Sequence, residues 1–70
     1  MKVGDLILDN TDGEVGLVIA IGPGIHTSDY VNYPDGIEPS WKVDWPSMPG
    51  LCDTGQDDLR CGDVEVISKA

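Results

Sequence analysis

The chain has 70 residues, with 4 Lys or Arg against 13 Asp or Glu, and its formal net charge is −9 at pH 7. A chain of this length makes one domain, residues 1–70, and buries only about 60% of its unfolded surface, which excludes a deep catalytic cleft between lobes. Its negative field repels phosphate backbones, so we expect no direct nucleic-acid binding, whereas a basic protein, a metal ion or solubility alone would suit the charge. Nine glycines and five prolines indicate many turns and favour an all-β fold.

The first part of the chain predicts two antiparallel strands. Residues 3–8 form the first strand, and the turn formers at 9–13 lead into the second strand, residues 15–21. Both faces of the second strand are apolar, so we expect it to be central and covered on both sides, with Gly16 marking a close backbone approach or a bulge. One of these faces should carry Val15, Leu17, Ile19 and Ile21.

The rest of the chain predicts three more strands and no helix. Residues 25–40 form an irregular connection that is long enough to be functional. Residues 41–45 alternate, with both tryptophans and Val43 on one face. A further strand is placed within residues 51–60, at 56–60, and the last strand is placed at 64–67. This pattern predicts an all-β fold, a small five-stranded SH3-like barrel with a long loop after the second strand.

Four segments that cover most of the predicted strands resemble a known group of proteins. They are VGDLI (residues 3–7), GEVGLVI (13–19), WKVDW (41–45) and DVEVIS (63–68). These segments are similar to small uncharacterised SH3-like β-barrel proteins of tailed bacteriophages, notably those that infect cyanobacteria. The first two also resemble the KOW element of ribosomal and transcription-factor barrels. KOW domains usually carry basic residues for RNA, however, and the net charge of −9 argues against that function.

The resemblance implies a fold and a phage origin, and hence a location in the cytoplasm of the infected host cell or in the virion. It does not fix a function, because one fold hosts many. Lys2 is followed by Val-Gly-Asp, and no run reaches 18 apolar residues, so we expect neither a signal peptide nor a membrane span. Cys52 and Cys61 are then expected to be reduced, although their spacing leaves a disulfide geometrically open.

Three patterns have a chemical interpretation, and a structural interpretation is favoured for each. Asp53-Thr54-Gly55 is the aspartic-protease triplet, but a single copy requires a homodimer, and a surface turn is favoured. The acids at 9–14 and 53–63 lack the EF-hand spacing and are interpreted as solvated turn residues. His26 and the two cysteines lack the close Cys pairs of a structural zinc site. We therefore expect no catalytic residue, metal or cofactor.

The four aromatic residues supply the candidate binding site. Trp41 and Trp45 are expected in the core, because the chain has no Phe to fill it. Tyr30 and Tyr33 lie in the long connection, where exposed aromatic rings are suited to contact another protein. His26 lies in the same connection and is the third candidate binding residue.

These features favour a non-enzymatic acidic protein-interaction module of a phage, with an unidentified protein partner and no membrane association. Two alternatives stay open. One is a structural or homo-oligomeric virion component whose barrel edges pair between copies. The other is an acidic nucleic-acid mimic that blocks a basic site on another protein.

Overall fold

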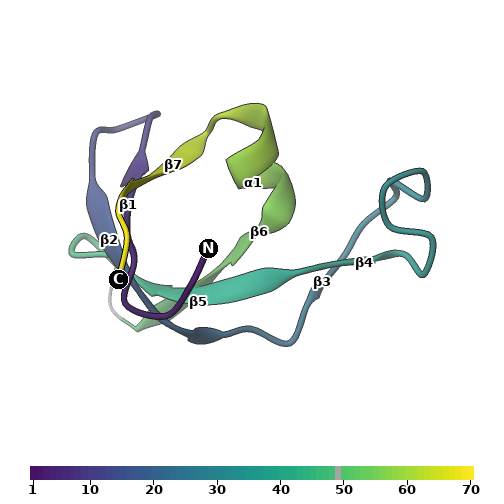
Figure 1. Cartoon of the computed structure of the whole chain (residues 1–70), viewed down its shortest axis with the longest axis horizontal. Helices are drawn as coiled ribbons and strands as arrows, with labels where there is room; N and C mark the ends of the chain where they lie inside the picture. Colours follow the sequence, from purple (N-terminus) through teal and green to yellow (C-terminus); the bar gives the residue numbers. More distant parts are fainter. Residues whose placement is uncertain (49) are drawn as a thin grey trace.

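A computed structural model of the chain describes residues 1–48 and 50–70 and consists mostly of strands (Figure 1). Five strands form one antiparallel sheet in the order β6-β5-β2-β1-β7, and β3 pairs with β4 in a separate hairpin. The elements are β1 (Leu6–Asp9), β2 (Val15–Ile21), β3 (Ile25–His26), β4 (Ile37–Glu38), β5 (Ser40–Asp44), β6 (Leu51–Gly55), α1 (Gln56–Cys61) and β7 (Val64–Ser68).

The large sheet curls into a half-barrel in which the last strand, β7, lies beside the first, β1. The other strands follow as an antiparallel meander from β1 through β2 and β5 to β6. The short helix α1 contacts both edge strands, β6 and β7 (Figure 1). The predicted all-β, SH3-like barrel architecture is confirmed.

A strand within residues 51–60 is confirmed as β6, but its placement at 56–60 and the prediction of no helix are wrong. Residues Gln56–Cys61 form α1, whose first turn carries Asp57 and Asp58 and whose last turn carries Arg60. Acids at the start and a base at the end complement the helix dipole. Gly62 then adopts φ 88°, a left-handed conformation that ends the helix without the strain a Cβ would bring. These local signals select a helix despite its short length.

The core lies on the inner face of the half-barrel and depends on the absence of a side chain in β2. Trp45 packs against β2 at Gly16, where a Cβ would lie only 2.6 Å from Trp45 Cε3 and 2.7 Å from Val43 Cγ1. The predicted close backbone approach at Gly16 is thus confirmed. The buried apolar side chains form one cluster, consisting of Ile7, Val18, Val43, Trp45 and Val64.

The prediction that β2 is covered on both faces is wrong. The strand is central, but only its inner face is buried, at Gly16 and Val18. On the outer face Val15, Leu17 and Ile19 are each 38–39% exposed. One curled antiparallel sheet has a single core side, so its other face can stay in water.

A bulge in β2 also makes the predicted side of Ile21 wrong. The register with β5 shifts between Val18 and Ala20, so that Ala20 pairs with Lys42 and Ile21 pairs with Trp41. Paired residues share a face, and one extra residue reverses the alternation beyond it. Ile21 therefore lies on the side of Trp41, not on the side of Leu17 as expected.

Asp5 joins the beginning of the chain to its end. Its buried carboxylate accepts hydrogen bonds from the backbone N–H groups of Ala70 and Lys2, each at 2.8 Å. These hydrogen bonds, first that from Ala70, lower the pKa of Asp5. The two ends of the chain consequently lie close together (Figure 1).

We expect Gly16→Ala to destabilise the fold by about 1–3 kcal/mol, because the new Cβ would overlap the Trp45 ring. Denaturant unfolding followed by tryptophan fluorescence measures the change. Val15→Ala, at the neighbouring exposed position, is the control and should cost less. Unchanged stability of Gly16→Ala would contradict the packing of Trp45 on β2.

Candidate functional site

The long connection after β2 is an ordered arm, defined here as residues 25–38. Its base is the β3–β4 hairpin, in which Ile25 pairs with Glu38 and His26 pairs with Ile37. Next to it, the Thr27 N–H donates to the Gly36 carbonyl at 2.9 Å. The arm extends from the half-barrel at one end of the molecule (Figure 1). The predicted long loop is therefore present, but it contains a hairpin.

The tip of the arm is built from consecutive hydrogen-bonded turns. The Tyr33 N–H donates to the Asp29 carbonyl at 3.0 Å, and the Gly36 N–H donates to the Tyr33 carbonyl at 2.8 Å. The Asn32 side chain donates to Asp29 Oδ2 at 2.8 Å. Gly36 has φ +74°, a left-handed conformation that glycine adopts without strain.

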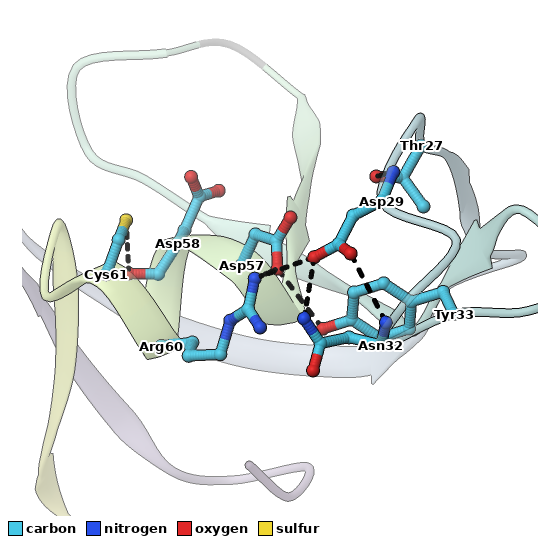
Figure 2. A network of polar contacts seen from close by, with 8 residues as sticks. All are labelled: Thr27, Asp29, Asn32, Tyr33, Asp57, Asp58, Arg60 and Cys61. Carbon is cyan, nitrogen blue, oxygen red and sulfur yellow. Dashed lines mark hydrogen bonds and ion pairs between the residues drawn. The ribbon is translucent and has the colours of Figure 1, made fainter.

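Two contacts fasten this tip to α1 (Figure 2). The Tyr33 hydroxyl donates to Asp57 Oδ1 at 3.2 Å. Arg60 Nη2 lies 3.0 Å from Asp29 Oδ2 and 2.9 Å from Asp57 Oδ1, so a single guanidinium joins an acid of the arm to an acid of the helix. The arm is thus held at its tip as well as at its base.

The charges around this junction shift the ionisation of its members. The pKa of Asp29 is lowered, first by hydrogen bonds from Asn32 and then by Arg60. The pKa of Arg60 is raised, chiefly by its hydrogen bond to Asp29. Burial, followed by the charge of Asp57, raises the pKa of the Tyr33 hydroxyl. The tyrosine therefore stays protonated and can donate its hydrogen bond at neutral pH.

Glu38 is the one arm carboxyl that is buried. Only 8% of the residue is exposed, and its Oε1 occupies the position that a Cβ on Gly55 would need. Burial is the largest cause that raises the pKa of Glu38, and the neighbouring carboxylates of Asp57 and Asp58 add to it, whereas Arg60 opposes it. A protonated Glu38 can donate a hydrogen bond to Asp57. Sequence reasoning missed this residue, because nothing local distinguishes Glu38 from a solvated acid.

The three predicted binding residues have different environments. Tyr30 is 65% exposed near the tip, next to Val31, which is 90% exposed. Tyr33 is only half-exposed and serves as part of the junction with α1. His26 is exposed in β3. Tyr30 and His26 are thus available to a partner, whereas Tyr33 is engaged with α1.

The protease-like triplet and the candidate metal ligands of the sequence do not form a chemical site in the part of the chain that the structure describes. The prediction that Asp53-Thr54-Gly55 is a surface turn is wrong, because the triplet is part of β6. Thr54 is buried there, and Asp53 forms an ion pair with Lys42 at 3.0 Å. Cys52 and Cys61 are free thiols. Across residues 1–48 and 50–70, no three His, Cys, Asp or Glu side chains are arranged to hold a metal ion. No helix in the same residues is long and apolar enough to cross a membrane.

An apolar groove lies at the base of the arm, between the end of β2 and the start of β5. Ile21, displaced by the bulge, faces Trp41 there. Its apolar walls are completed by Ile37 of the arm and by the two flanking prolines, Pro23 and Pro39. The exposed tip and this groove form one candidate contact region, carried by an arm that has three acidic residues, of which Glu38 is buried, and no Lys or Arg.

We expect Glu38→Gln to stabilise the fold at pH 7. A carboxyl with a raised folded-state pKa holds its proton more tightly in the folded than in the unfolded state, so it lowers stability as pH rises through that pKa. Each unit by which the pKa of Glu38 is higher in the folded than in the unfolded state corresponds to about 1.4 kcal/mol of stability lost above that pKa. Below the ordinary value of 4.5 both states are protonated, and the advantage of the variant should disappear.

Denaturant midpoints at pH 7 and at pH 4 measure this difference. Glu65→Gln, at an exposed acid of β7, is the control and should leave the midpoints nearly unchanged. A loss of stability in Glu38→Gln at pH 7 would show that the Glu38 carboxylate is favourably paired, contrary to the geometry described here.

Comparison with known proteins adds no relative: no protein-family model, curated protein or solved structure matches the chain. The resemblance to phage barrels stays a prediction from the sequence.

Proposed function

We propose that this protein is a non-enzymatic, acidic protein-interaction module that binds its partner through the arm. The observation that carries the proposal is the fastening of the arm at both ends, by the β3–β4 hairpin and by Arg60 and Tyr33 on α1. A segment that is already ordered loses little conformational entropy when it binds. The free arm is thus prepared to present Tyr30 and Val31 to another surface.

The charge of the arm favours a basic partner. Asp35 is an exposed acid of the arm, the arm contains no Lys or Arg, and the nearby Arg60 of α1 is already engaged by Asp29 and Asp57. With a net charge of −9 on the whole chain, association with a basic protein should be accelerated by electrostatic attraction and weakened by salt. A phage origin, and a site of action in the infected cell or the virion, are part of the proposal and depend on the sequence resemblance alone.

The non-enzymatic part of the proposal is supported by the environment of the one protease-like motif. Asp53 forms an ion pair with Lys42 on the neighbouring strand. A carboxylate that is neutralised by a lysine is not free to share a proton with a second carboxylate, as the aspartic-protease mechanism requires. The homo-oligomeric and nucleic-acid-mimic alternatives stay predictions, and no contact described above favours either.

The test is to recover a partner from a bacterial host lysate with the immobilised protein and to measure its affinity for purified variants. We expect Tyr30→Ala combined with Val31→Ser to weaken binding about tenfold or more, as removal of central interface residues does. Raising the salt concentration should weaken binding further. The control is Val3→Ser, at an exposed apolar residue outside the arm, which should bind like the wild type. A partner that is indifferent to the arm variant would overturn the proposal.

A further inference from the structure

We propose that the outer face of the sheet is a second docking surface, and that its partner is a protein patch with an apolar centre and Lys or Arg at its border. This surface is formed by β1, β2 and β7 and does not include the arm. The inference therefore goes beyond the proposed function and does not depend on it.

The register of the sheet gathers apolar side chains on this face. Leu6 pairs with Leu17, and Leu8 pairs with Val15, in the antiparallel β1–β2 ladder. Paired residues project to the same side of a sheet. Ile7, between the two leucines, is fully buried on the inner side, so Leu6 and Leu8 must project outward.

The group of outward apolar residues is continuous across three neighbouring strands. The bulge in β2 leaves Ile19 exposed beside it, and the irregular β1–β7 register leaves Ile67 exposed on the next strand. Contiguous apolar surface of this kind on a small soluble protein is a common mark of an interaction site. Five members of the group are 37–48% exposed, namely Leu6, Val15, Leu17, Ile19 and Ile67.

Two exposed acids lie at the border of this apolar group. Asp44 pairs with Leu17 from the β5 side, and Glu65 pairs with Leu8 from the β7 side, and both acids are exposed. The one base on the β5 side, Lys42, is paired with Asp53 at 3.0 Å. An occupant that carries Lys or Arg around an apolar centre would bury the aliphatic side chains and approach both carboxylates.

The same charges disfavour a second copy of this chain as the occupant. A symmetric dimer places the same patch on both sides, so both copies would bring Asp44 and Glu65 to one interface. Each copy also has a net charge of −9. Like charges brought together at an interface oppose association, so the sheet face is suited to a basic partner rather than to itself.

The test uses a synthetic amphipathic helical peptide with leucines on one face and lysines along its borders, titrated into the ¹⁵N-labelled protein and followed by NMR. A peptide of the same length with glutamates in place of the lysines is the matched probe. We expect the lysine peptide to shift the resonances of β1, β2 and β7, and the glutamate peptide to shift none. Equal binding of the two peptides, or shifts confined to the arm, would overturn the inference.

Variants separate the apolar and the charged contributions. Leu17→Ser should weaken binding of the lysine peptide about tenfold, since it removes an aliphatic contact. Asp44→Asn with Glu65→Gln changes only exposed positions and should reduce the salt dependence of binding while leaving the fold intact. Tyr30→Ala should leave peptide affinity unchanged, which distinguishes this surface from the arm. Unchanged affinity and salt dependence in both outer-face variants, or light scattering that shows a dimer which Leu17→Ser dissociates, would refute the proposed docking surface.

Discussion

The packing of Trp45 against the bare backbone of β2 at Gly16 is the contact on which the rest of the molecule depends. With no side chain at this position, the ring lies beside β2 and joins Ile7, Val18, Val43 and Val64 in the buried core. A chain of 70 residues has little apolar surface to bury, so the loss of one such contact removes a large share of its stability. The single inner core also explains why the other face of the sheet stays in water.

Two surfaces follow from this one-sided construction. The outer face retains the aliphatic residues of β1 and β2, bordered by Asp44 and Glu65. The arm extends from the end of the half-barrel and is held by an ion-pair network on α1 (Figure 2). The helix therefore does more than connect β6 to β7, because Asp57 and Arg60 fix the arm. Both surfaces are acidic, which is consistent with basic partners.

Much of the fold was predictable from local patterns, whereas the anchoring of the arm was not. Alternation at residues 41–45 and the glycine at 16 indicated the inner face correctly, because each reflects packing within one strand. The helix at Gln56–Cys61 was missed, since six residues carry too little periodicity to be read. The burial of Glu38 and the pairing of Arg60 with Asp29 join segments far apart in the sequence, and no local signal reports such contacts.

Amide hydrogen exchange measured residue by residue tests most directly the central claim, that a small core supports an arm that is already ordered in the free protein. The slowest exchange should occur in β1, β2 and β5, around the core. The amides of Thr27, Tyr33 and Gly36, which donate to arm carbonyls, should show intermediate protection. If these three amides exchange as fast as those of an unfolded chain while the sheet stays protected, the arm is not ordered in advance and the account is contradicted.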